Sequence, residues 1–205
     1  MKRFIVTLCV LCMTGYSFAQ NHGIMDNTAS PYVKLKSIDI GDCQWTTGFW
    51  ADKFKLCETS MLPYMESVLT GDVGHALNNF KIAAGMKKGK HEGFAWHDGD
   101  FYKFIEAALY VYAQNKDKEL LKRLDSYIEI ICKAQGEDGY IHAKIQIDPK
   151  IDHYENRKYH EMYNSGHLFT SACIHYRVTG QKNFLDIAIK QADLLYIIFM
   201  PDTDT

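Results

Sequence analysis

The sequence predicts an all-α protein built from helical hairpins that form part of an α/α toroid. Apolar residues recur at helical spacing over residues 101–112 and again over 120–132, and a short polar break joins the two stretches. A second pair of amphipathic stretches follows at 167–178 and 184–199. The unit of helix, short turn, helix and long loop repeats with a period of roughly 65 residues, which is typical of toroids. Two hairpins do not close a ring.

Composition and charge exclude several other classes of protein. The chain has 205 residues, of which 47% are hydrophobic and 23% charged, with only 4 Pro and 14 Gly, so disordered and collagen-like classes are excluded. Lys and Arg number 23 while Asp and Glu number 25, which gives a formal net charge of −2. Because there is no basic excess to release counterions, we expect no nucleic-acid partner.

The first 19 residues are expected to be a signal peptide that directs the protein to the periplasm or the extracellular space. Lys2 and Arg3 precede an apolar run over residues 4–13, and Ser17 and Ala19 place small residues before a cleavage point. The apolar run is too short to span a bilayer, and no other long apolar run follows it. We therefore expect no membrane partner.

The elements after the signal peptide follow in a simple order. Residues 20–46 form a polar lead-in, and the alternation of apolar and polar residues at 32–46 predicts one or two short β-strands. Residues 53–70 predict an amphipathic helix with a kink at Pro63. A short apolar stretch at 78–86 then leads into a loop rich in Gly, Lys and His.

The two hairpins are separated by a turn at 136–140, an alternating run at 140–147 that favours an extended chain, and a polar loop at 148–160. Gly180 lies where a glycine that ends a helix is expected. The expected organisation is therefore a signal peptide at 1–19, a lead-in with short strands at 20–46, and part of a helical barrel at 47–205.

Four cysteines remain after the signal peptide: Cys43, Cys57, Cys132 and Cys173. An oxidising compartment permits disulfides, and the pairing of the four stays open. No CxxC pair and no zinc-finger spacing occurs among them. Because Cys132 and Cys173 fall on apolar helix faces, we expect them to be small buried side chains.

Four stretches carry a resemblance to a known family. They are HALNNFKIAAG at 75–85, DGDFYKFIEA at 98–107, AQ and DGYI within 134–141, and HEMYNSGHL at 160–168. Together, and in this order, they resemble the N-terminal portion of glycoside hydrolase family 127, the β-L-arabinofuranosidase family, whose fold is an (α/α)6 barrel of six helical hairpins. Gly99 and the Trp96-His97 pair depart from the family pattern in the loop that would shape the pocket.

The resemblance implies a retaining β-L-arabinofuranosidase that releases L-arabinofuranose from plant glycans, with an oligosaccharide or glycan as its substrate. The family's cysteine nucleophile, its glutamate and its zinc-binding cysteines lie well C-terminal of this sequence. The resemblance therefore implies zinc in the full-length enzyme, but no catalytic residue, metal ligand or cofactor within these 205 residues. The chain is expected to be a truncated N-terminal part that is inactive alone.

His160 is the first candidate for substrate binding. By resemblance it contacts the sugar in the −1 pocket, and a neutral imidazole can donate to or accept from a sugar hydroxyl. The alternative is a histidine that caps or packs at the start of a helix. His167 lies two helical turns further on and could share the same face, but two histidines alone are a poor indication of a metal site.

Asp98 and Asp100 stand two apart just before a strong helix. They could recognise hydroxyl groups or orient pocket side chains, or they could be an N-cap and a first-turn acid that stabilise the helix. Second-rank candidates for the pocket are His75, Asn79 and Lys103. Tyr102, Tyr163 and Trp96 could stack on a sugar or belong to the core.

Two other functions stay open from the sequence. One is a glycosidase of the same fold that acts on another pectin-type sugar, such as a branched acidic one. The other is a non-catalytic carbohydrate-binding helical module. An open reading frame that continues with paired cysteines and a glutamate-rich segment would favour an enzyme over the module.

Overall fold

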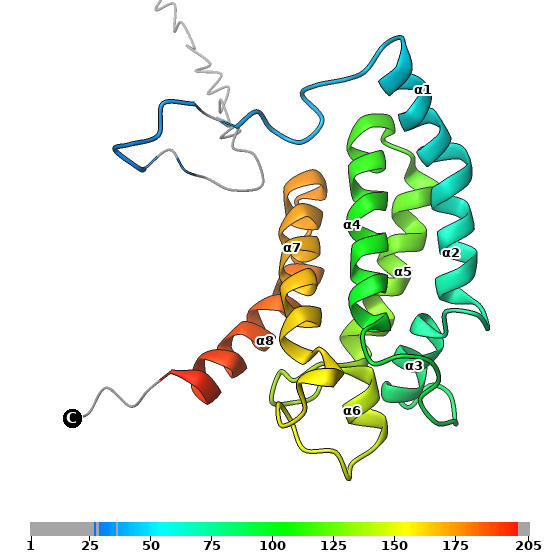
Figure 1. Ribbon diagram of the computed structural model, residues 1–205, viewed down its shortest axis with the longest axis vertical. Helices are drawn as coiled ribbons and strands as arrows, with labels where there is room; N and C mark the ends of the chain where they lie inside the picture. The colour runs from blue at the N-terminus through cyan, green and yellow to red at the C-terminus, as the bar shows by residue number, and fades with distance from the viewer. Residues whose placement is uncertain (1–26, 28, 36, 201–205) are drawn as a thin grey trace, which may run out of the picture.

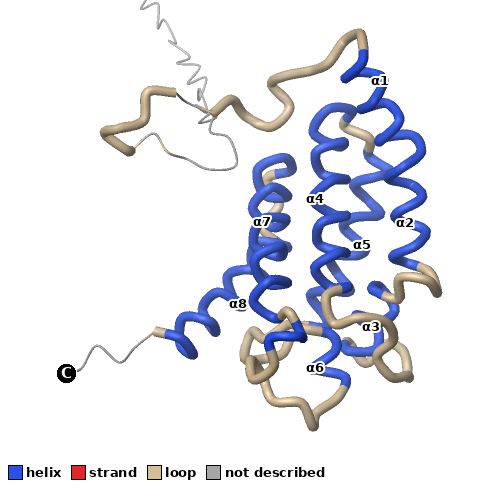
Figure 2. The backbone as a smooth tube through the Cα atoms, viewed as in Figure 1, coloured by secondary structure: helices blue, strands red, loops and turns tan. Residues whose placement is uncertain are grey.

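The computed structural model describes residues 27, 29–35 and 37–200, and the predicted signal peptide lies outside them. Figure 1 shows two long helical hairpins side by side, and Figure 2 shows that this part of the chain holds helices and loops without a strand. The hairpins are α4 (His97–Asn115) with α5 (Lys118–Ala134), and α7 (Glu161–Thr179) with α8 (Asn183–Phe199). The prediction of an all-α, partial toroid is confirmed. No described helix has the length and apolar character needed to cross a membrane.

The short connectors that form the hairpins follow from local chemistry. Lys116 ends α4 in the left-handed conformation, and the carboxylate of Asp117 then accepts the backbone N–H groups of Glu119 and Leu120 at 2.9 and 3.3 Å. This side-chain cap satisfies donors that have no partner in the first turn of a helix. Gly180 ends α7 with a φ of 76°, as predicted, because a side chain is disfavoured in that conformation.

The first helical segment is a single rod with a defect in its middle. It comprises α1 (Phe49–Leu56), a π-helical turn (Cys57–Met61) and α2 (Leu62–Thr70). Pro63 lacks a backbone N–H and cannot continue the regular ladder of hydrogen bonds, and the π turn lies immediately before it. The predicted kink therefore takes the form of a widened turn.

The prediction of short strands in the lead-in is wrong for the described residues. Residues 32–35 and 37–46 contain only turns, bends and irregular chain. Leu35 and Ile38, which belong to the alternating pattern, are exposed. Alternation predicts a strand only where a second strand is available to pair with it, and the described part of the chain supplies none.

The alternating run at 140–147 is also not extended, because α6 (Ala143–Ile147) forms there. The carboxylate of Asp98 accepts the N–H of Ala143 at 2.7 Å, and the side chain of Gln146 accepts the N–H of His142 at 2.9 Å. Ala143 and Ile145 are buried, and α6 packs on α3 (Ala76–Ala83). Tertiary hydrogen bonds and burial therefore override the local pattern.

Cys132 and Cys173 are exposed, so the expectation that they are buried is wrong. The core face of α5 is formed by Leu124, Ile128 and Ile131, and Cys132 lies one residue beyond it, which turns its side chain about 100° away. None of the four cysteines that follow the signal peptide is paired in the described structure.

The core is organised around α4. This helix packs against α7 most extensively and also contacts α2, α3 and α5. Its buried side chains meet neighbours on several sides, and the largest of those that are fully buried are Phe101, Tyr102, Ile105 and Leu109. Figure 1 shows α4 between α7 and α2, with α5 behind it.

At Gly99 the start of α4 lies close against α7. The side-chain oxygen of Asn164 accepts the N–H of Gly99 at 3.1 Å, and the side-chain nitrogen of Asn164 donates to the carbonyl of Ala95 at 3.0 Å. A Cβ atom on Gly99 would lie 2.5 Å from that oxygen. Because the buried amide is bonded at both ends, it has no free direction in which to move. Gly99 therefore sets the distance between the starts of two helices.

Replacing Gly99 by Ala should destabilise the protein. An added methyl group gains some helix propensity, but it overlaps the Asn164 amide and should cost a net ~1–3 kcal/mol, as overpacking in a close-packed core does. The control is Gly166→Ala on α7, where a Cβ would have no atom within 4 Å, and this change should stabilise by up to about 1 kcal/mol. Urea unfolding followed by circular dichroism measures both. Equal stabilisation by the two changes would show that α7 yields at this point.

Candidate functional site

A cleft lies where α4 and α7 begin. It consists of two adjoining hollows of about 370 and 380 Å³, both lined by His160 and Tyr163. Trp96 closes one side, and the other hollow is lined by the loop before α7 and by Phe199 of α8. We call this region the His160 cleft. The size and the mixture of aromatic and polar walls suit a small polar ligand.

His160 lies at the junction of the two hollows. It has a φ of 60° and a ψ of 27°, and its carbonyl accepts the N–H of Asn164 at 2.8 Å as α7 begins. Its ring meets Trp96 edge to face at 5.1 Å and Tyr163 at 5.8 Å between centroids. None of the described residues hydrogen-bonds its ring nitrogens, so the imidazole is available to a ligand.

A polar chain runs along the α4–α7 face from the cleft. The ammonium of Lys103 lies 2.7 Å from the carboxylate of Asp100 and donates to the hydroxyl of Tyr163 at 2.9 Å. Burial alone would lower the pKa of Lys103, but its hydrogen bonds to Asp100 and Tyr163 outweigh that effect and raise it. Lys103 is therefore a fixed positive charge beside the cleft wall.

His167 joins the same chain through Tyr163, with ring centroids 4.6 Å apart. Burial first, and then the charge of Lys103, lower the pKa of His167 against the opposing influence of Asp100. The imidazole of His167 is therefore harder to protonate than that of an ordinary histidine. The structure thus brings Asp100, His160 and His167 together around Tyr163.

Asp98 lies beneath this surface. Asp98 is 1% exposed. One of its carboxylate oxygens accepts the N–H of Ala143, and the other has no partner among the described residues. Burial raises the pKa of Asp98, although nearby His142 and the bond from Ala143 act in the opposite direction. Asp98 is in the first turn of α4 rather than at its N-cap, which is Trp96. The carboxylate of Asp98 binds the N–H of the first residue of α6 and so stabilises the start of that helix.

Asn79 and His75 hold the loop that carries Trp96. The buried amide of Asn79 donates to the carbonyl of Glu92 at 2.9 Å and accepts its N–H at 3.1 Å. The Nδ1 atom of His75 lies 3.2 Å from a carboxylate oxygen of Glu92. The oxygen and the nitrogen of the Asn79 amide therefore both bind Glu92, and the loop held in this way places Trp96 beside the cleft.

The aromatic candidates divide between the wall of the cleft and the core. Trp96 and Tyr163 wall the cleft, and Trp96 is itself stacked on Phe94 with centroids 4.4 Å apart. Tyr102 is buried in the core against Phe80, so it is inaccessible to a sugar.

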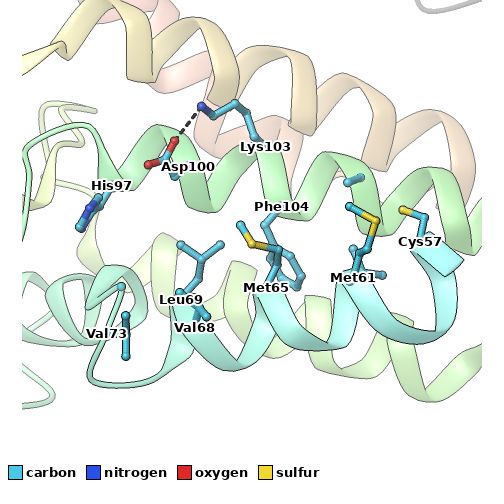
Figure 3. Close-up of a pocket in the computed structure, with 13 residues that line it drawn as sticks. Cys57, Met61, Met65, Val68, Leu69, Val73, His97, Asp100, Lys103 and Phe104 are labelled. Atoms are coloured by element: carbon cyan, nitrogen blue, oxygen red, sulfur yellow. Dashed lines mark ion pairs between the residues drawn. The ribbon is translucent and has the colours of Figure 1, made fainter.

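A larger groove of about 620 Å³ lies between the first helical rod and α4 (Figure 3). Met61, Met65 and Leu69 line one wall of it and Phe104 lies opposite, while the Asp100–Lys103 ion pair sits on its rim. Apart from this rim and His97 the walls are apolar, so a sugar would find few hydrogen-bonding partners there. The smaller His160 cleft is the better candidate for a polar ligand.

The described residues do not fit a zinc site. No group of three or more His, Cys, Asp or Glu side chains within residues 27–200, the undescribed positions aside, is placed to hold a metal ion. The four cysteines belong to separate elements: the lead-in, the π turn, α5 and α7. A tetrahedral site needs its ligands in one place.

Sequence reasoning missed three residues that shape this site. Asn164 joins α4 to α7, Glu161 is a buried carboxylate beside His160, and Arg157 lines the second hollow. Asn164 and Glu161 occur within the 160–168 stretch that carries the family resemblance, which was the only available signal.

Comparisons with known proteins agree with one another. The family model described as β-L-arabinofuranosidase, GH127 catalytic domain, matches residues 42–203. A non-reducing end β-L-arabinofuranosidase of Bifidobacterium longum subsp. longum is 30% identical over an alignment 179 positions long, which covers 77% of this chain and 27% of that protein. The chain thus spans about a quarter of the length of this curated relative.

Solved structures show the same likeness. A GH127 β-L-arabinofuranosidase from Geobacillus stearothermophilus T6 superposes with a TM-score of 0.75 and 32% identity, over 78% of this chain and 26% of that one. A second GH127 β-arabinofuranosidase gives a TM-score of 0.68 and 35% identity, over 74% of this chain and 25% of its own.

The burial of Asp98 predicts an unusual dependence of stability on pH. Because folding raises its pKa, the stabilising contribution of this group is fully present below its unfolded pKa of about 3.8 and is lost as the pH rises through the folded pKa. Asp98→Asn is permanently neutral and keeps an oxygen for the Ala143 N–H. It should be at least as stable as the wild type at pH 7 and should show a flatter stability profile above pH ~4.

The control is Asp98→Ala, which leaves the buried N–H of Ala143 without its acceptor and should be about 1–3 kcal/mol less stable than Asp98→Asn at every pH. Urea unfolding at several pH values measures all three proteins. A marked loss of stability in Asp98→Asn at pH 7 would show that the ionised carboxylate is needed.

Proposed function

The chain belongs to the β-L-arabinofuranosidase family GH127, and from this membership we propose that it forms part of a retaining glycosidase that releases L-arabinofuranose from plant glycans. The one observation in this chain that carries the proposal is the His160 imidazole. It faces a cleft at the starts of two helices, between Trp96 and Tyr163, without a hydrogen-bond partner among the described residues.

The residues of this chain would bind and orient the sugar rather than break its bond. The imidazole of His160 exchanges a hydrogen bond with a furanose hydroxyl, and the rings of Trp96 and Tyr163 offer apolar faces to the sugar carbons. Lys103 holds the hydroxyl of Tyr163 and thereby fixes the ring. Glu161 is the one carboxylate that lines the cleft, and it is buried and occupied by other donors.

Export is part of this proposal. The order of positive residues, apolar run and small residues over 1–19 supports a signal peptide. Export is consistent with a glycan substrate that lies outside the cell.

A second candidate is a glycosidase of the same family that acts on an acidic sugar. The observation in its favour is Arg157, which lines the hollow that adjoins His160 and makes no ion pair with any described residue. A guanidinium in that place could bind a carboxylate in bidentate fashion. Hydrolysis of neutral and carboxylated aryl glycosides by the full-length protein separates the two candidates.

The 205-residue chain alone should not hydrolyse an aryl β-L-arabinofuranoside. Retaining glycosidases need two catalytic groups flanking the bond, and the described part of the cleft offers no such pair. Release of the aryl group by purified chain is the measurement, with heat-treated chain as the blank. Hydrolysis that copurifies with the chain would contradict the proposal that its residues bind the sugar without breaking the glycosidic bond.

In the full-length enzyme, His160→Ala should lower kcat/KM about tenfold to a hundredfold, the equivalent of the ~1–3 kcal/mol that a lost polar partner costs. Folding should change little, because the ring is only partly buried. His167→Ala is the comparison, and it should lower Tm more than it lowers activity, because its ring packs on Tyr163. Equal and small effects of both changes on kcat/KM would make His160 a structural residue.

A further inference from the structure

The first residue of α7 is a buried acid. Glu161 is 6% exposed, and both of its carboxylate oxygens accept the backbone N–H of Tyr154, at 3.0 and 2.9 Å. One of them also accepts the hydroxyl of Tyr140. No cation of the described chain pairs with this carboxylate. Its charge is therefore balanced by neutral donors and by the start of a helix, where an acid is favourable.

The same network joins three separate segments to α7. The side chain of Gln191, on α8, donates to the hydroxyl of Tyr154 at 3.1 Å and accepts the N–H of Ile141 at 2.9 Å. Burial, and to a smaller extent Glu161, raise the pKa of Tyr140 far above its ordinary value, so its hydroxyl stays a donor. The turn before α6 and the 148–160 loop thus meet at the carboxylate of Glu161, and Gln191 of α8 bonds both of these segments.

The segment held by this carboxylate is conformationally strained at both ends. Tyr154 has a φ of 62° and His160 a φ of 60°, and the described chain has only two other non-glycine residues with positive φ. Such a conformation costs of order 1–2 kcal/mol per residue and persists only where the surroundings enforce it. Glu161 bonds the backbone of the first strained residue and directly follows the second.

We propose that Glu161 is a positioning residue, which clamps the 154–160 segment so that His160 and Arg157 face the cleft. The inference rests on the proposed function, because it gives His160 a sugar to meet. A carboxylate is required since both oxygens face one N–H donor. In a glutamine the NH2 group would replace one of these oxygens and would lie within about 3.0 Å of the N–H of Tyr154, so that two donors would face each other and the clamp would open.

Trypsin digestion of the full-length protein tests the clamp without any substrate. Arg157 and Lys158 are exposed trypsin sites within the clamped segment, and Lys87 and Lys88 are exposed sites in the loop that Asn79 holds. In Glu161→Gln, cleavage after Arg157 and Lys158 should accelerate at least about fivefold, because the free energy of local opening falls. Cleavage after Lys87 and Lys88 should keep its wild-type rate.

The matched control is Glu155→Gln, which removes the same charge from an exposed position in the same loop and should leave all cleavage rates unchanged. If Glu161→Gln accelerates cleavage in both loops, the variant has unfolded, and Tyr140→Phe then decides. That change removes one donor to the carboxylate and keeps the ring. Acceleration confined to residues 157–158 supports the clamp, and wild-type rates overturn it.

A double-mutant cycle tests whether Glu161 acts through His160. Glu161→Gln should lower kcat/KM about tenfold in the wild-type enzyme and less than about twofold in the His160→Ala background. Additive losses would show that Glu161 serves the fold in general and would overturn the positioning role. If the wild-type enzyme has no glycosidase activity, the proposed function fails, and the trypsin rates still decide the clamp.

Discussion

The geometry of the His160 cleft depends first on the side-chain amide of Asn164. Asn164 of α7 spans from the N–H of Gly99 to the carbonyl of Ala95, and so it fixes the start of α4 against the start of α7. Trp96 directly precedes one helix and His160 the other, so their mutual distance follows from this bridge. The Asn164 oxygen approaches so closely that a Cβ atom at position 99 would lie 2.5 Å from it, which is why glycine stands opposite the amide.

Buried and half-buried polar groups have different tasks in this chain. The buried amide of Asn79 and the buried carboxylate of Glu161 each bind the backbone of a long loop, at Glu92 and at Tyr154. Those loops carry the residues that wall the cleft. Half-buried groups such as Lys103 instead point along the cleft wall. Helices thus provide fixed points, and polar side chains transfer their rigidity to irregular segments.

The sequence is sufficient for the hairpins, because the spacing of apolar residues along α4 and α5 is visible within each helix. It is insufficient for α6, whose first N–H is bound by Asp98, 45 positions earlier. The bridge from Asn164 reaches Gly99 across 65 positions, and no local pattern announces it. His160 could be named as a candidate through family resemblance, whereas its left-handed backbone and its clamp emerge only when distant segments meet.

The place of Trp96 has an optical consequence. The chain contains three tryptophans, and Trp45 and Trp50 are 54% and 65% exposed, so their emission is that of an indole in water. Trp96 is half-buried between the rings of Phe94 and His160. The emission of an indole depends on the rings that it contacts, so a ligand that displaces the His160 imidazole should change it. The short-wavelength part of the emission therefore reads out the state of His160 without any added label.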